Sequence, residues 1–212
     1  MKNIKICTPV IGKTLKEFLK NLTQVQDVSP MIELRVDQIK NLTLNDLETI
    51  RKITNKEAIL NSRNTKIIIK GFKSGFDYVD IDINTIKNFK ISKSQKSKTI
   101  LSFHDFEKTP NINKLTSIVN RMREYNVGVL KIATMVTSDQ DITNLSQILL
   151  NKKKIEKMII VGMGEKGKLT RILGPLLGSF LTFASTEFGS SAPGQINIVE
   201  MKTIYKLLFT NH

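Results

Sequence analysis

The chain has 212 residues, of which 40% are hydrophobic, and a formal net charge of +14 at pH 7, so it fits one large domain or two small ones with a sizeable core. No apolar run approaches the ~20 residues of a membrane span, and the start, MKNIKICTPV, lacks the long apolar region of a signal peptide, so we expect a cytoplasmic protein with no membrane partner. The single cysteine, Cys7, and only two histidines exclude an internal disulfide and argue against a zinc site.

Apolar and β-branched runs alternate along the chain with stretches of helical period. In the first such stretch, Leu15, Phe18, Leu19 and Leu22 recur at helical spacing. Because no linker or shift in composition interrupts the alternation, we predict one (β/α)₈ barrel over residues 1–212, with a doubly wound open sheet as the alternative. The predicted strands are residues 4–10, 31–37, 57–62, 78–83, 99–104, 127–135, 157–163 and 179–185.

The second predicted strand, MIELRVD, alternates apolar and charged residues. Because successive side chains on a strand point to opposite faces, Glu33, Arg35 and Asp37 share one face. The apolar face of a barrel strand packs against the surrounding helices, so the charged face would point inward. Charges are costly there unless they are paired or used in function.

Other predicted strands carry polar residues near their carboxyl ends, where barrel enzymes keep their chemistry. Taken singly, each of these residues could be an ordinary surface group. Because five strands converge on one mouth of the barrel, we predict a site there. The polar residues of the third to sixth strands are Arg63, Asp80, Asp82, His104 and Lys131.

Lys131 and His104 are the candidate catalytic residues. Lys131 shares its strand face with Val129, Ala133 and Met135, and we expect burial and nearby arginines to lower its pKa and leave a neutral amine. Such an amine can attack a carbonyl and form a Schiff base. His104 can transfer protons near neutral pH.

The glycine-rich segment IIVGMGEKGKLTR follows the seventh predicted strand. Gly162, Gly164 and Gly167 fit the dinucleotide fingerprint, but that motif belongs to the first unit of its fold. Leu169 stands where a P-loop needs Ser or Thr to hold magnesium. A helix that starts there could still bind a carboxylate or phosphate, with Arg171 one turn into it.

Six motifs in one order cover nearly the whole chain, and through them it resembles the type I 3-dehydroquinate dehydratases of the shikimate pathway. The resemblance implies a (β/α)₈ barrel, usually a homodimer, that converts 3-dehydroquinate to 3-dehydroshikimate without metal or cofactor. The motifs are ELRVD, SFHDFEKTP, LKIATM, MGEKGKLTRILG, LTFAS and SSAPGQI.

The resemblance also implies roles for single residues. Lys131 would be the Schiff-base lysine and His104 the general acid and base. The ring hydroxyls of the substrate would be held by Glu33, Arg35 and Arg63, and its carboxylate by Arg171, Ser191 and Gln195.

Two other functions are alternatives. A class I aldolase would also use a lysine on the sixth strand, but it would not explain SSAPGQI. The charge of +14 makes a nucleic-acid binder worth considering. However, the lysines are spread along the chain and no aromatic residues interleave with them, so we expect no nucleic-acid partner.

The chain departs from the family after Arg63. Relatives usually carry a Glu-Gly-Gly loop there, whose glutamate supports the catalytic histidine, but this chain continues NTKIIIKGF and then DYVDIDI. A histidine that alternates between base and acid needs a partner that stabilises its cation. We predict that Asp80 or Asp82 takes this role.

Overall fold

The computed structural model describes residues 4–209, so residues 1–3 and 210–212 of the predicted 1–212 domain lie outside the described residues. In the described part, nine parallel strands form one sheet in the order β7-β6-β5-β4-β3-β2-β1-β8-β9. The strands are β1 (Ile6–Val10), β2 (Met31–Arg35), β3 (Glu57–Asn61), β4 (Tyr78–Asp82), β5 (Thr99–Asp105), β6 (Val129–Met135), β7 (Met158–Met163), β8 (Thr182–Ser185) and β9 (Ile196–Asn197).

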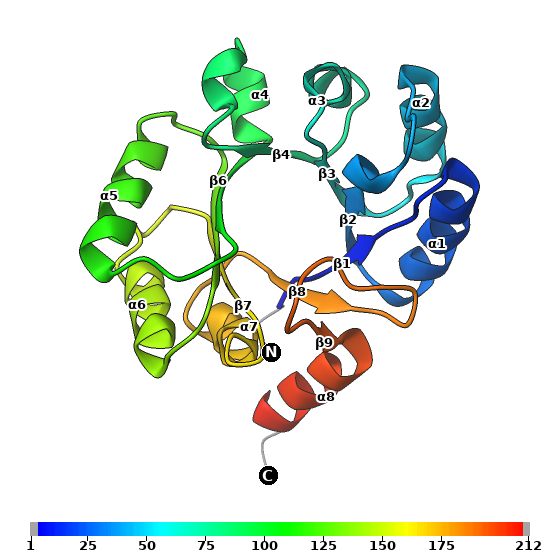
Figure 1. Ribbon diagram of the computed structural model, residues 1–212. Helices are drawn as coiled ribbons and strands as arrows, with labels where there is room; N and C mark the ends of the chain where they lie inside the picture. Colours follow the sequence, from blue (N-terminus) through cyan, green and yellow to red (C-terminus); the bar gives the residue numbers. More distant parts are fainter. Residues whose placement is uncertain (1–3, 210–212) are drawn as a thin grey trace.

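The sheet curls into a ring that is surrounded by helices (Figure 1). Backbone ladders join neighbouring strands from β7 round to β9, and where β7 meets the segment just before β8 the Phe180 N–H donates to the Met158 carbonyl at 2.8 Å. The helices are α1 (Leu15–Val28), α2 (Leu44–Ile53), α3 (Thr65–Lys73), α4 (Lys93–Ser97), α5 (Ile112–Arg123), α6 (Asp139–Leu150), α7 (Lys168–Leu176) and α8 (Ile198–Phe209).

All eight predicted strands are present, with ends shifted by up to three residues. Besides the short helix α4, two other elements were not predicted. The short strand β9 pairs with β8, and NTKIIIKGF forms most of α3, whose first turn is capped by Asn64. Gly71 lets α3 lie close to the sheet, because a Cβ there would come within 2.2 Å of Leu60 Cδ2.

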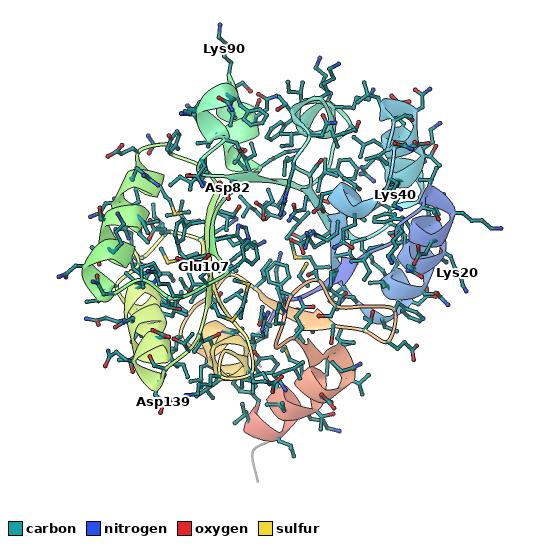
Figure 2. The ribbon with its side chains drawn as sticks, in the orientation of Figure 1. Lys20, Lys40, Asp82, Lys90, Glu107 and Asp139 are labelled. Carbon is teal, nitrogen blue, oxygen red and sulfur yellow. The ribbon has the colours of Figure 1, made fainter. Side chains whose placement is uncertain are left out.

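Apolar cores lie on both sides of the barrel wall, and a third apolar cluster packs α8 against β8 and β9. The outer core joins the helices to outward strand residues such as Ile32, Leu34 and Ile132. The inner core fills the floor of the barrel. Figure 2 shows Lys20, Lys90 and Asp139 projecting outward from the outer elements, whereas Asp82 lies nearer the barrel axis. The inner residues are Cys7, Met31, Ile59, Ile100, Val129, Ala133, Ile159, Val161, Leu181 and Phe183.

Alternation along each strand then places polar residues above this floor. Glu33 follows Met31 by two positions, and Lys131 follows Val129 in the same way. The prediction that the charged face of MIELRVD points into the barrel is therefore confirmed for Glu33, which is 3% exposed. In residues 4–209, no helix is both long and apolar enough to cross a membrane.

Candidate active site

The carboxyl-terminal ends of the strands surround a cavity of about 470 Å³. Its lining comes from β2 to β8 and from the loops that follow them. All eight residues predicted for the site line this one cavity: Glu33, Arg35, Arg63, His104, Lys131, Arg171, Ser191 and Gln195.

Lys131 lies at the bottom of the cavity and is 5% exposed. Its Nζ atom donates to Asp80 Oδ2 at 2.9 Å and to Glu33 Oε1 at 3.2 Å. The ring centroid of Phe183, which belongs to the inner core, lies 4.8 Å from the same nitrogen. The amine is therefore held between two carboxylates above an apolar floor.

These carboxylates reverse the expected pKa shift of Lys131. Burial acts to lower the pKa of its ammonium group, but Asp80 and Glu33 raise it above its ordinary value. The prediction of a lowered pKa is wrong, because it placed arginines and not carboxylates beside the amine. In the free protein Lys131 is an ammonium ion.

Glu33 and Arg35 from β2 have separate partners. Glu33 Oε1 also accepts from Asn61 Nδ2 at 3.0 Å. Burial acts to raise the pKa of Glu33, but Lys131 and Arg35 lower it overall. The guanidinium of Arg35 donates to both oxygens of Asp37, at 2.9 and 2.8 Å, which fixes its plane at the wall of the cavity.

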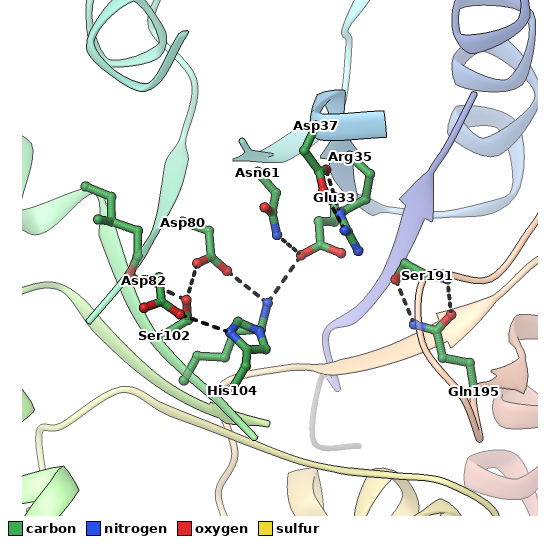
Figure 3. Close-up of polar contacts among 12 residues, drawn as sticks. Glu33, Arg35, Asp37, Asn61, Asp80, Asp82, Ser102, His104, Ser191 and Gln195 are labelled. Atoms are coloured by element: carbon green, nitrogen blue, oxygen red, sulfur yellow. Dashed lines mark hydrogen bonds and ion pairs between the residues drawn. The ribbon is translucent and has the colours of Figure 1, made fainter. Parts of the chain in front are cut away.

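His104 lies beside Asp82, with 3.7 Å between His104 Nδ1 and Asp82 Oδ2. Burial acts to raise the pKa of Asp82, but His104 and the backbone N–H of Asn84 lower it overall. Asp80, two residues earlier on β4, instead contacts Lys131 and accepts from Ser102 Oγ at 2.5 Å. In Figure 3, Asp82 contacts His104, whereas Asp80 contacts Ser102.

Arg171 lies in the first turn of α7 and is 1% exposed. Its backbone carbonyl accepts from Thr182 Oγ1 and from Tyr205 Oη, which ties α7 to β8 and α8. Nη2 donates to the Pro193 carbonyl at 3.3 Å, but within the described residues Nε and Nη1 have no hydrogen-bond partner. Burial lowers the pKa of Arg171 to about 10, so the group remains a cation at neutral pH.

Ser191 and Gln195 lie on the segment between β8 and β9. Gln195 Oε1 accepts from the Ser191 backbone N–H at 3.0 Å, and Gln195 Nε2 donates to Ser191 Oγ at 3.3 Å (Figure 3). A Cβ at Gly194 would meet the Gly164 carbonyl at 2.1 Å. Only glycine avoids this clash at position 194, where φ is also positive at 73°, and the hydrogen bond from the Gly164 N–H to the Pro193 carbonyl holds the segment against the loop before α7.

Arg63 follows β3 and is exposed at the rim of the cavity. Asn61, Ser102 and Phe106 are among the lining residues that were not predicted from the sequence. Asn61 and Ser102 share inward strand faces with Ile59 and His104, and this alternation could have identified them. The Phe106 ring stacks on His104, with centroids 5.8 Å apart and planes 6° apart, and nothing in the strand pattern predicts that.

A barrel with a cluster of buried ionisable groups at its carboxyl-terminal mouth belongs to the class of barrel enzymes. Comparison with known proteins identifies which one. The family model "Type I 3-dehydroquinase" matches residues 6–212. The chain is 39% identical over 219 residues to the 3-dehydroquinate dehydratase of Coxiella burnetii (strain Dugway 5J108-111), covering 97% of this chain and 94% of that protein.

Solved structures of 3-dehydroquinate dehydratases have the same fold as this chain. The 3-dehydroquinate dehydratase of Geobacillus kaustophilus HTA426 superimposes with a TM-score of 0.84 at 23% identity, covering 99% of this chain and 93% of that chain. That of Aquifex aeolicus VF5 gives a TM-score of 0.78 at 27% identity, covering 97% and 99%. The chain belongs to the type I 3-dehydroquinase family. The predicted barrel fold, family and hydro-lyase activity are thereby confirmed.

Proposed function

We propose that the cavity at the barrel mouth is the active site, and that it converts 3-dehydroquinate to 3-dehydroshikimate and water through a Schiff base on Lys131, without metal or cofactor. The observation that carries this proposal is the burial of Lys131 at the bottom of the cavity that His104 also lines. A buried amine beside a proton-transferring group suits covalent catalysis on a ketone.

Each catalytic group has one task in this reaction. The nitrogen of Lys131 replaces the ketone oxygen of the substrate and forms an iminium ion, which draws electrons and acidifies the adjacent C–H. His104 removes that proton and returns a proton to the departing hydroxyl group, so that water leaves. Hydrolysis of the product imine then restores the lysine.

The other residues bind the substrate. Arg171 presents buried donors that suit a carboxylate, and Ser191 and Gln195 lie near it on the segment after β8. The ring hydroxyls would contact Glu33, Arg35 and Arg63. Together these groups define a substrate that is small, polyhydroxylated and anionic.

The direct test is the appearance of the ultraviolet absorbance of the product enone when 3-dehydroquinate is added to the purified protein. We expect activity to persist after prolonged incubation with EDTA, because the proposed chemistry uses side chains alone. Loss of activity that a divalent cation restores would contradict the proposed mechanism.

We also propose that the protein works as a homodimer in the cytoplasm. The usual assembly of the family supports the dimer, and α8 exposes the apolar side chains of Val199, Leu207 and Leu208, which a second subunit could cover. The single cysteine, Cys7, is buried and free, as suits a reducing compartment.

We propose further that Asp82 is the carboxylate that supports His104. Replacing Asp82 by Asn should lower kcat by about 10-fold or more, because the amide does not stabilise the imidazolium cation. Steady-state assays from pH 5 to 9 measure kcat and its pH profile.

Asp77→Asn is the matched control. Asp77 precedes β4 at the opposite end of that strand, where its Oδ2 accepts from the Ala58 N–H. This variant should leave kcat and its pH profile unchanged. If Asp82→Asn behaves like the control, His104 works without a carboxylate partner.

A further inference from the structure

Lys131 is flanked by two buried carboxylates, although one would neutralise its charge. Asp80 is 4% and Glu33 3% exposed, and both lie within hydrogen-bond distance of Lys131 Nζ, with Asp80 the nearer at 2.9 Å. The other oxygen of Asp80 accepts from Ser102 Oγ, and Ser102 is 1% exposed. The mechanism proposed above gives Asp80 no task.

The charge of this cluster restricts where the proton of Lys131 can go. Lys131, Asp80 and Glu33 together carry one negative charge while the lysine is an ammonium ion. If the ammonium lost its proton to bulk water, two carboxylates would face each other in a buried site without that cation, which is strongly unfavourable because like charges repel more in a buried site than in water. The proton should therefore stay within the cluster.

The positive charge of Arg35 determines which carboxylate can accept the proton of Lys131. The charge of Glu33 acts on Arg35 more strongly than that of Asp80, and Arg35 in turn lowers the pKa of Glu33. When Lys131 becomes neutral, Glu33 therefore still faces a permanent cation and stays an anion. Asp80 has less of that support and lies closer to the nitrogen.

We propose that Asp80 is the proton acceptor and donor for the formation and hydrolysis of the imine, while His104 is reserved for the C–H and hydroxyl steps. This inference rests on the proposed function and adds a second acid–base residue to it. Two carboxylates on one strand would then serve different steps, Asp80 through Lys131 and Asp82 through His104.

The steps balance without any further reactant. Asp80 takes one proton from the ammonium group, and the neutral amine adds to the carbonyl carbon as the C–N bond forms. Asp80 then protonates the carbonyl oxygen, and it takes a second proton from the nitrogen. The C–O bond breaks as Asp80 gives that proton to the departing hydroxyl, which leaves as water. The iminium keeps one N–H, so the charge of the cluster is the same before and after.

The test compares Asp80→Asn with the matched variant Asp82→Asn by rapid mixing with 3-dehydroquinate, quenching into borohydride and mass spectrometry of Lys131. For Asp80→Asn we expect labelling to be at least about 10-fold slower than in the wild type. For Asp82→Asn we expect labelling at the wild-type rate together with a lowered kcat. Asp80→Glu, which keeps a carboxylate, should regain much of the rate.

The sign of the effect separates proton transfer from a purely electrostatic role. If Asp80 were only a counter-ion, its removal would lower the pKa of Lys131 and increase the amount of neutral amine, so labelling would be faster. Unchanged or faster labelling in Asp80→Asn would thus overturn the inference. A wild type that is never labelled at Lys131 would overturn the proposed function, and this inference with it.

A substrate deuterated at the carbon that loses its proton gives a second readout. In Asp80→Asn the isotope effect on kcat should fall toward 1, because imine formation or hydrolysis becomes rate-limiting. In Asp82→Asn it should persist or rise. If Asp80→Asn does not fold, as judged by its thermal unfolding, Asp80→Ser, which also lacks the carboxylate, carries the test through the same two measurements, and wild-type values in both would overturn the inference.

Discussion

Replacing Lys131 by arginine is expected to lower kcat/KM by at least about 10⁴-fold while the protein stays folded. A guanidinium keeps the positive charge between Asp80 and Glu33 but cannot form an imine under these conditions. In the wild type, borohydride added with 3-dehydroquinate should attach one ligand mass to Lys131, and Lys131→Arg should remain unlabelled. Intact mass spectrometry followed by peptide mapping measures this.

Lys131→Met separates catalysis from stability. It should be as inactive as Lys131→Arg, but it leaves Asp80 and Glu33 buried without their cation. Breaking a buried ion pair in this way costs about 3–5 kcal/mol in the free energy of unfolding. The assignment is refuted if either variant keeps substantial activity, or if the wild-type label maps to another lysine.

The strand faces were predictable because alternation is a local property. Alternation in MIELRVD separates an apolar face from a charged face, and the barrel predicted from the other strands then directs Glu33 and Arg35 inward. The same reasoning placed Lys131 and His104 on the inner surface. The fold class followed from the number of such strands and the helical stretches between them.

The pairing of individual side chains was not predictable, because it depends on strand register. Ser102 lies opposite Asp82 in one ladder and opposite Lys131 in the next. This register sets the depth of each residue in the barrel, so Asp80 reaches the lysine while Asp82 reaches His104. Sequence alone limited the histidine's partner to Asp80 or Asp82, and the wrong pKa direction for Lys131 has the same origin.

Helix α3 was missed for a different reason. The residues IIIK contain three consecutive β-branched side chains, which lowers helix propensity and hides the period. In the barrel, Ile67 and Ile68 are buried against the sheet and Asn64 caps the first turn. Tertiary packing thus makes a helix of a segment in which the sequence pattern predicted none.

Replacing Arg171 by alanine is expected to raise KM for 3-dehydroquinate by about 30-fold to 1000-fold, which corresponds to about 2–4 kcal/mol. Its guanidinium is buried, and Nε and Nη1 lack partners in residues 4–209. These donors are already desolvated and held in place before a carboxylate binds. The charge-assisted hydrogen bonds therefore contribute almost fully to the free energy of binding. Steady-state kinetics measures the change. The KM of Arg171→Lys should lie between those of the wild type and Arg171→Ala, because lysine keeps the charge but loses the bidentate geometry.

Although replacing Arg171 should weaken substrate binding, it should not lower the thermal stability of the free protein. This difference distinguishes a binding role from a structural one. A buried cation without an anion destabilises the unliganded fold, so Arg171→Met, which keeps much of the volume, should unfold at the same temperature as the wild type or a higher one. Added 3-dehydroquinate should then stabilise the wild type far more than the variant, because only a bound ligand shifts the unfolding equilibrium. An unaltered KM, or a large loss of stability in the free Arg171→Met variant, would show that Arg171 holds the barrel together and does not bind the substrate.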